Sequence, residues 1–319
     1  MQTDTADHGG GVDAAAAHWG GARSDWIDLS TGINPLPYPV PPLPPQAWAA
    51  LPDQAAQAAL VAAARAFWKV PDGAAVLAAP GASVLIAQLP FVAPKDRVRL
   101  HLPTYNEHAR AFAAAGWQQA EAGSAAEANV IVHPNNPDGR LQDLPDPTAA
   151  PFCIVDESFC DVTPAASHMP HAGRAGVVIL KSFGKFWGLA GLRLGFAIGD
   201  PTSVGRLAQG LGPWPVSGAA LAIGAQALRD TDWAKATRTR LARDAARLDT
   251  MITAKGAEIV GGTTLFRLYR VEDAAQWQDH FARHQIWTRI FPYSRHWLRL
   301  GLAGSDAHWA RLQQAVAAL

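Results

Sequence analysis

Cysteine, long apolar runs and an excess of charge of either sign are all scarce in this sequence. Its 319 residues include only two cysteines, too few for a disulfide framework, so we expect reduced thiols packed in the interior. Lysine plus arginine and aspartate plus glutamate both number 27, so no surplus charge indicates nucleic acid or an anionic membrane as a partner. The first ten residues, MQTDTADHGG, lack the basic region and apolar core of a signal peptide.

Signatures of a membrane span, a dinucleotide site and a zinc hydrolase are also missing. The most apolar long window, 74–94, is broken by two prolines, a glycine and a glutamine, so we expect no membrane-spanning helix. A Rossmann protein needs G-x-G-x-x-G after its first strand, and the chain has none. The pairs His168/His171 and His280/His284 lack the glutamate of H-E-x-x-H. We therefore expect a cytoplasmic protein without a metal.

Short runs of valine, isoleucine and leucine are what the sequence does contain. Runs that are apolar throughout are typical of strands covered on both faces, so they predict an α/β fold with a mixed, mostly parallel sheet and helices on both faces. Polar residues follow each run, and in open α/β sheets ligands bind at the carboxyl ends of the strands. The predicted strands are 97–102, 129–133, 152–155, 177–180 and 194–198.

The composition and the predicted secondary structure of the sequence change twice along the chain. The proline-rich stretch 32–45 (GINPLPYPVPPLPP) cannot form a helix or a central strand, so we expect extended chain on the surface. Beyond about residue 217, helical stretches alternate with strands such as LFRLYRV and HWLRLGL, which indicates a smaller α+β domain. We predict an N-terminal arm, a large domain and a small C-terminal domain, spanning 1–45, 46–212 and 213–319.

One lysine, Lys185, lies in the glycine-rich and apolar segment SFGKFWGLAGLRLG. A lysine amine is a good nucleophile only when neutral, and burial lowers its pKa. We therefore expect Lys185 to be buried near a strand end, where it could form a Schiff base with an aldehyde cofactor such as pyridoxal 5′-phosphate (PLP). Such a cofactor needs donors and a cation for its phosphate, a carboxylate for its pyridine nitrogen, a stacking partner and a donor to its ring oxygen.

Each of these requirements has a candidate at a predicted strand end, although each candidate also has an ordinary structural explanation. The phosphate donors could be a plain helix start, the carboxylate a cap or ion pair, the stacking residue a core tyrosine, and the amide donor part of a turn. The candidates for the phosphate are Gly81, Ala82, Ser83, Ser182 and Arg193. The candidate carboxylate is Asp156, the candidate stacking residue is Tyr105, and the candidate donor to the ring oxygen is Asn136.

The order GAS, PTY, PNNPDG, VDESF and SFGKFWGLAGLRLGF resembles the fold-type I PLP enzymes of the class I/II aminotransferase superfamily over nearly the whole chain. The resemblance implies a PLP cofactor, a homodimer, and Lys185 as Schiff-base lysine and proton shuttle. It assigns Asp156 to the pyridinium nitrogen, Asn136 to the ring oxygen and Tyr105 to ring stacking. It also implies that Ser83, Ser182, Arg193 and the Gly81/Ala82 backbone bind the phosphate.

Two branches of this superfamily share these motifs. DHGGG, DWIDLSTGINPLPYP and GPWPVSGAAL resemble the threonine-phosphate decarboxylases of cobalamin biosynthesis, which convert L-threonine O-3-phosphate to (R)-1-amino-2-propanol O-2-phosphate and CO2. The resemblance implies that His8 and Asn34 bind the substrate phosphate and that Arg289 and Arg299 lie at the substrate anion site. Outside the resemblance, His8 would be an ordinary terminal histidine and the two arginines surface charges.

The alternatives are a histidinol-phosphate aminotransferase on the same scaffold and a PLP-binding regulator. A regulator of this kind normally carries a DNA-binding domain, and the predicted domains leave no residues for one. Two positions depart from the family pattern. Phe159 stands where many relatives have a tyrosine near the ring oxygen, and Leu51 stands where relatives often have a tyrosine that reaches the partner subunit's phosphate.

Overall fold

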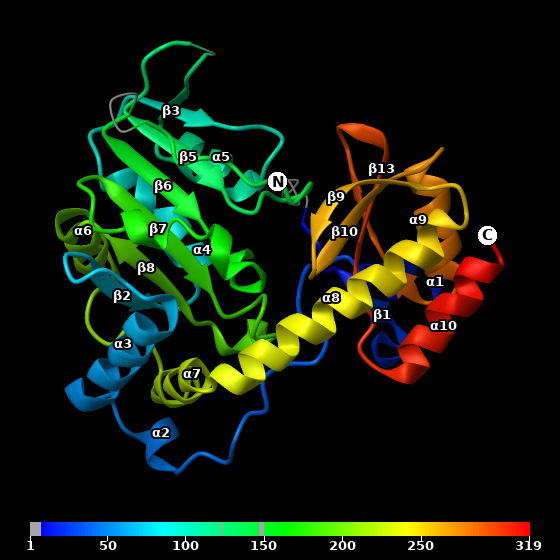
Figure 1. Ribbon diagram of the computed structural model, residues 1–319, viewed down its shortest axis with the longest axis horizontal. Helices are drawn as coiled ribbons and strands as arrows, with labels where there is room; N and C mark the ends of the chain where they lie inside the picture. The colour runs from blue at the N-terminus through cyan, green and yellow to red at the C-terminus, as the bar shows by residue number, and fades with distance from the viewer. Residues whose placement is uncertain (1–7, 122, 147–149) are drawn as a thin grey trace. The chain divides into compact units, whose positions relative to one another are not determined.

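The computed structural model describes residues 8–121, 123–146 and 150–319 (Figure 1). Seven of the ten residues behind the signal-peptide prediction lie outside this described part. The chain divides into two compact units, here called the large unit (37–136 and 140–235) and the small unit (up to residue 36, 137–139 and 236–319). Among the described residues, no helix is both long enough and apolar enough to cross a membrane.

The unit boundaries differ from the predicted domain boundaries at 45/46 and 212/213. Helix α7 (Gly218–Arg229) packs against α3 (Gln54–Trp68), and Arg229 Nη2 donates to the Ala59 carbonyl at 3.4 Å. Helix α7 is therefore part of the large unit, and the chain passes from this unit to the C-terminal part of the small unit within α8 (Thr231–Thr253).

A seven-stranded sheet is the centre of the large unit, in the order β2-β8-β7-β6-β5-β3-β4 (Figure 1). Strand β8 runs antiparallel to both of its neighbours and the other pairs are parallel, so the predicted mixed, mostly parallel sheet is confirmed. The strands are β2 (Ala75–Ala79), β3 (Arg97–Leu100), β4 (Gln118–Gln119), β5 (Ala128–Val132), β6 (Phe152–Asp156), β7 (Val177–Ser182) and β8 (Gly195–Gly199).

Helices cover both faces of this sheet, which explains why its strands are apolar throughout. On one face Leu85 and Ile86 of α4 (Ala82–Gln88) pack in a core with Ile154 and Leu180. On the other face Trp68, at the end of α3, packs edge-on against Phe196 with ring centroids 4.9 Å apart. The other described helices of this unit are α2 (Gln46–Ala49), α5 (Asn106–Ala114) and α6 (Pro201–Leu211), with the short 3-10 turns η2 (Leu89–Phe91), η3 (Cys160–Val162), η4 (Pro164–Ala166), η5 (Met169–His171) and η6 (Ala190–Leu192).

The proline-rich stretch and the two cysteines follow the sequence expectation. Residues 32–45 contain no helix or strand, although Tyr38 within them is buried and its N–H donates to the Trp187 carbonyl at 2.9 Å. Cys153 and Cys160 are free, buried thiols, and burial raises the pKa of both. Neither thiol is therefore a ready nucleophile.

The small unit is an α+β structure with two sheets. One is antiparallel in the order β12-β13-β10-β9, and the other is the parallel pair of β1 and β11. Its strands are β1 (Ile27–Asp28), β9 (Glu258–Thr263), β10 (Phe266–Arg270), β11 (Ile286–Trp287), β12 (Arg289–Phe291) and β13 (Ser294–Gly301). Its helical elements are α1 (Val12–Trp19), η1 (Arg23–Asp25), the rest of α8, α9 (Ala274–Arg283) and α10 (Asp306–Ala317).

Candidate active site

All nine residues that the sequence predicts to bind the cofactor line a single pocket of the large unit. The pocket holds about 680 Å³, part of it open to solvent, and lies where strands β5, β6 and β7 end and α4 begins. Its lining combines apolar side chains with convergent polar groups, as small-molecule sites commonly do. The nine residues are Gly81, Ala82, Ser83, Tyr105, Asn136, Asp156, Ser182, Lys185 and Arg193.

Lys185 lies in the loop after β7 and is only partly buried, so the expectation of a buried lysine is wrong. Its Nζ lies 5.3 Å from the centroid of the Phe159 ring. The loop that carries it is rigidly supported, because Trp187 stacks between Phe183 and Trp233 with centroid distances of 5.2 Å on both sides. The amine therefore faces the pocket from a fixed stretch of backbone.

Asp156, the last residue of β6, is a buried carboxylate with only 2% of its surface exposed. Its Oδ2 lies 2.9 Å from His108 Nε2, and its Oδ1 accepts hydrogen bonds from the N–H and Oγ of Ser158 at 3.0 and 2.5 Å. Burial alone favours the protonated acid, but His108 and Ser158 together hold the pKa of Asp156 below its usual range. The pocket therefore contains a fixed negative charge at neutral pH.

His108 and Ser158 hold the Asp156 carboxylate, and neither is among the residues predicted from the sequence. His108 is buried in α5, three residues after Tyr105, and their rings meet edge-on at a centroid distance of 6.2 Å. Three residues make nearly one helical turn, so the spacing alone could have placed His108 beside the pocket. Ser158 follows Asp156 by two residues, the ordinary spacing for a serine that donates to a carboxylate in a turn.

We predict that Ser158→Ala lowers the free energy of unfolding by about 2 kcal/mol at pH 7, because a charge-assisted hydrogen bond is lost in a buried site. The pKa of Asp156 is depressed in the folded protein, so its contribution to stability is present above the unfolded pKa of about 4 and is lost as pH falls through the folded value. The difference between wild type and variant should therefore shrink below about pH 4. Urea unfolding of both proteins at several pH values measures it, and a difference independent of pH would contradict the assignment.

Glycines let the backbone approach closely at the end of the pocket where α4 begins. Gly81 precedes α4 with a φ of 95°, and a Cβ there would lie 2.7 Å from Arg193 Nη2. A Cβ at Gly195 would lie 2.5 Å from the Ala82 nitrogen. Arg193 itself adopts a φ of 54°, a conformation unfavourable for a non-glycine residue and often found at functional sites. This end of the pocket combines a guanidinium with the Ser83 hydroxyl, as an anion site requires.

Tyr105 and Asn136 complete the pocket. Burial, with a further contribution from the Asp156 carboxylate, raises the pKa of Tyr105 to about 12, so its ring is neutral. Asn136 lies in the turn after β5, and the buried Asn135 beside it donates from Nδ2 to the Pro103 carbonyl at 3.0 Å and accepts from Thr104 Oγ1 at 2.7 Å. The turn that presents Asn136 is thus held by side-chain hydrogen bonds.

The four predicted substrate residues belong to the small unit, which brings three of them together. Arg289 and Arg299 are directly paired across β12 and β13. Arg289 Nη1 donates to the His8 carbonyl at 2.9 Å, and Arg299, 5% exposed, donates from Nη2 to the Ser30 carbonyl at 2.8 Å. The two guanidiniums thus come from paired positions on adjacent strands, and each donates to a backbone carbonyl.

Asn34, the fourth, contacts a different arginine of the same unit. It is 1% exposed, and its Oδ1 accepts from Arg240 Nη2 at 2.6 Å and from the Leu36 N–H at 3.1 Å. These bonds fix the amide and bring the Arg240 guanidinium beside it.

The two departures from the family pattern occupy different surroundings. Phe159 is 5% exposed and lines the pocket beside Lys185. Leu51 is 68% exposed on the large unit.

The histidine pairs contact backbone carbonyls, with His168 Nε2 2.8 Å from the Gln142 oxygen and His280 Nε2 2.7 Å from the Ala315 oxygen.

The pocket at the strand ends of this mixed, mostly parallel sheet is lined by a lysine, a buried carboxylate, a guanidinium and serine hydroxyls, as expected of an α/β enzyme of the fold-type I class. Residues 118–319 match the family described as aminotransferase class I and II. Together with full-length relatives at up to 40% identity, this match shows that the chain belongs to that family.

The relatives differ in how much of their sequence they share with this chain. A threonine-phosphate decarboxylase of a Sinorhizobium species is 40% identical and one of Pseudomonas aeruginosa is 37% identical, each over 97% of both chains. A histidinol-phosphate aminotransferase of Mesorhizobium japonicum is 25% identical over 88% of this chain and 84% of its own. The fold resembles that of a Sinorhizobium meliloti histidinol-phosphate aminotransferase solved with pyridoxal 5′-phosphate, with a TM-score of 0.76, 18% identity, and coverage of 97% of this chain and 95% of that one.

Proposed function

We propose that this protein is a PLP-dependent decarboxylase that converts L-threonine O-3-phosphate to (R)-1-amino-2-propanol O-2-phosphate and CO2. The observation that carries the proposal is the likeness, at 40% identity over 97% of both chains, to a threonine-phosphate decarboxylase. Arg289 and Arg299 add a physical reason, because this substrate carries both a phosphate and a carboxylate.

The large-unit pocket fits PLP by the chemistry of its donors. The hydroxyls of Ser83 and Ser182 and the guanidinium of Arg193 line it with Asp156 and Lys185. In the described chain no side chain caps the start of α4, so the first N–H groups of this helix can bind the phosphate. The Tyr105 ring would stack on the cofactor and Asn136 would donate to its ring oxygen.

Lys185 and Asp156 have separate roles in the reaction. When bound, PLP accepts the electron pair that remains on the substrate α-carbon as CO2 leaves. Asp156, ionised and fixed by His108 and Ser158, keeps the pyridine nitrogen protonated. Lys185 Nζ holds the cofactor between turnovers and gives a proton to the α-carbon, so that a C–H bond replaces the C–C bond that breaks.

Arg289 and Arg299 are proposed to bind the substrate anions, with His8 and Asn34 at the phosphate. Holding the carboxylate in a fixed direction decides which α-carbon bond breaks, so anion binding selects decarboxylation over proton loss.

Product analysis tests the proposal against the aminotransferase alternative. Purified, PLP-loaded protein is given L-threonine O-3-phosphate in one reaction and L-histidinol phosphate with 2-oxoglutarate in another. We expect CO2 and aminopropanol phosphate from the first and no glutamate from the second. Glutamate without CO2 would overturn the decarboxylase proposal and indicate a phosphate-accepting aminotransferase.

We also propose that the protein is a homodimer and acts in cobalamin biosynthesis in the cytoplasm. Two large apolar side chains lie exposed close together in the sequence of the large unit, Trp48 at 72% and Leu51 at 68%. We infer that both side chains lie in the subunit interface, where a partner would remove them from water. The free thiols of Cys153 and Cys160 fit a reducing compartment.

We predict that the double substitution W48E/L51E converts the dimer to a monomer, because it places two carboxylates in the apolar interface. Sedimentation velocity over a range of protein concentrations measures the change. Tyr293→Glu, at a tyrosine of the small unit that is 54% exposed, is the matched control and should remain dimeric. A double variant with the wild-type association constant would place the interface elsewhere.

A further inference from the structure

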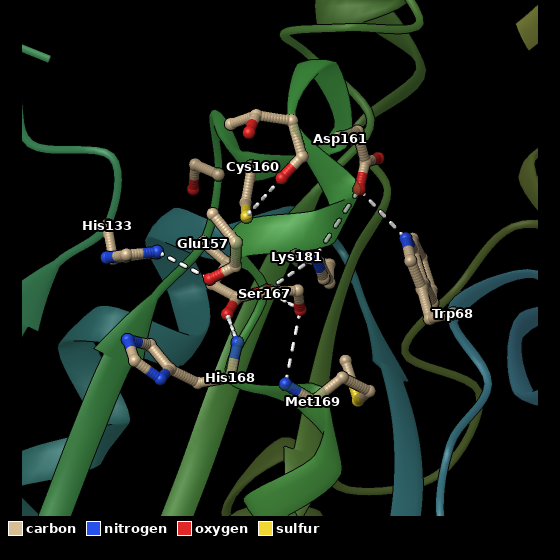
Figure 2. Close-up of polar contacts among 12 residues, drawn as sticks. Trp68, His133, Glu157, Cys160, Asp161, Ser167, His168, Met169 and Lys181 are labelled. Atoms are coloured by element: carbon tan, nitrogen blue, oxygen red, sulfur yellow. Dashed lines mark hydrogen bonds and ion pairs between the residues drawn. The ribbon is translucent and has the colours of Figure 1, made fainter. Parts of the chain in front are cut away.

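A second lysine, Lys181, lies fully buried near the end of β7 and forms ion pairs with two carboxylates (Figure 2). Its Nζ lies 2.7 Å from Glu157 Oε2 and 3.4 Å from Asp161 Oδ1. The side chains of Lys181, Glu157 and Asp161 are 2%, 0% and 4% exposed. These three residues, here called the buried triad, do not line the pocket.

Further hydrogen bonds connect the buried triad to the segments around it. The Glu157 carboxylate accepts from the His168 N–H at 2.5 Å and from Ser167 Oγ at 2.6 Å, and Asp161 Oδ1 accepts from Trp68 Nε1 at 2.9 Å. Figure 2 shows the side chains of Glu157 and Asp161 directed at Lys181, with Ser167 bonded to Glu157. The triad therefore ties β7, the residues after β6 and the end of α3 together.

The charges of Glu157 and Lys181 are both maintained in the interior. Burial favours the neutral acid, yet the Lys181 ammonium holds the pKa of Glu157 below its usual range, and the two carboxylates raise the pKa of Lys181 despite its burial. Buried ion pairs of this kind contribute little net stability, since apolar residues of similar volume often serve as well. A contribution to stability is therefore a weak explanation for the presence of three charged residues in the interior.

The position of the triad along the chain gives a stronger reason. Glu157 directly follows Asp156, and Lys181 directly precedes Ser182. Successive residues of extended chain point to opposite faces of a sheet, and Asp156 and Ser182 line the pocket. The Glu157 N–H also donates to the Leu180 carbonyl at 3.0 Å, so the two strand ends are joined by backbone as well.

We propose that the buried triad positions Asp156 and Ser182 for PLP from the opposite face of the sheet. This inference rests on the cofactor site proposed above. Glu157, Asp161 and Lys181 are positioning residues in this account, because they act through their neighbours. The Glu157–Lys181 ion pair fixes the separation of the β6 and β7 ends, and with it the distance between the carboxylate for the pyridine nitrogen and the hydroxyl for the phosphate.

The test compares Lys181→Met with a destabilising control in the same unit. Asp200→Ala removes the cap that Asp200 provides to Ser203 N–H at the start of α6, and Asp200 N–H bonds Val177 at the other end of β7. For each protein we would measure thermal stability without cofactor, the Kd for PLP, and the visible circular dichroism of bound PLP, which reports how the ring is held. Lys181→Arg, which keeps the charge, is the rescue variant.

We expect Lys181→Met to weaken PLP binding by about tenfold or more and to change the circular dichroism band, because small misplacements of binding groups have large effects. Asp200→Ala should keep both wild-type values, and Lys181→Arg should recover most of them. If Lys181→Met does not fold, Glu157→Gln is judged by the same two readouts. Wild-type values in the variant, or failure of Lys181→Met, Lys181→Arg and Glu157→Gln alike to fold, would overturn the positioning role. A wild-type protein that does not bind PLP would instead contradict the proposed function.

Discussion

Replacing Lys185 by alanine is expected to lower kcat for CO2 release from L-threonine O-3-phosphate by about 10⁴-fold, since both the covalent hold on the cofactor and the proton donor are removed. The pocket should keep its shape, because Lys185 is only partly buried and its loop is held by the stack of Phe183, Trp187 and Trp233. PLP should therefore still bind, but without a covalent bond to the protein.

Borohydride reduction followed by peptide mass spectrometry separates binding from covalent attachment. The wild-type peptide that contains Lys185 should gain the mass of the reduced cofactor, and the variant should gain none. Lys95→Ala, at an exposed lysine of the same unit, is the matched control and should keep both activity and the adduct. An active Lys185→Ala protein would remove Lys185 from the mechanism.

The second large effect is expected at Asp156. Asp156→Asn preserves the size of the side chain but removes the negative charge, and we expect kcat to fall by about 10²- to 10³-fold, because that charge stabilises a protonated pyridine nitrogen. Folding should be largely maintained, since the amide can still bond Ser158 and His108.

The comparison is with Asp161→Asn, the same isosteric substitution at a second buried aspartate. Steady-state kinetics give kcat for both variants. Both carboxylates are buried and lie five residues apart, but Asp161 contacts Lys181 and Trp68 instead of lining the pocket. We expect the smaller loss of kcat in Asp161→Asn. Equal losses in the two variants would mean that positioning of the site by the buried triad, and not the charge at the pyridine nitrogen, limits the rate.

Much of the large unit could be predicted because its strands carry a strong local signal. The apolar runs 177–180 and 194–198 correspond to β7 (Val177–Ser182) and β8 (Gly195–Gly199), and the polar residues after such runs meet in one pocket. Parallel strands bring their carboxyl ends to one edge of the sheet, so the order of motifs in the chain becomes proximity in space.

The remaining features depend on tertiary contacts that no local pattern contains. Strand β2 (Ala75–Ala79) is alanine-rich, a composition that favours helix, and pairing with β8 makes it a strand. Lys181 has no motif of its own, so its burial against Glu157 emerges only when β6 and β7 are side by side. The expectation that Lys185 would be buried failed for the same reason. A glycine-rich, apolar segment does not show whether one of its side chains lies in the core or faces a pocket that is open to solvent.

The most direct test of the central claim is the reaction of L-threonine O-3-phosphate in D2O with the PLP-loaded protein, followed by NMR and mass analysis of the product. If CO2 leaves and Lys185 returns the proton from one side, the aminopropanol phosphate carries one deuterium in a single configuration at the carbon that lost CO2. Product with deuterium in both configurations, or a 2-oxo acid with no CO2 released, would contradict it.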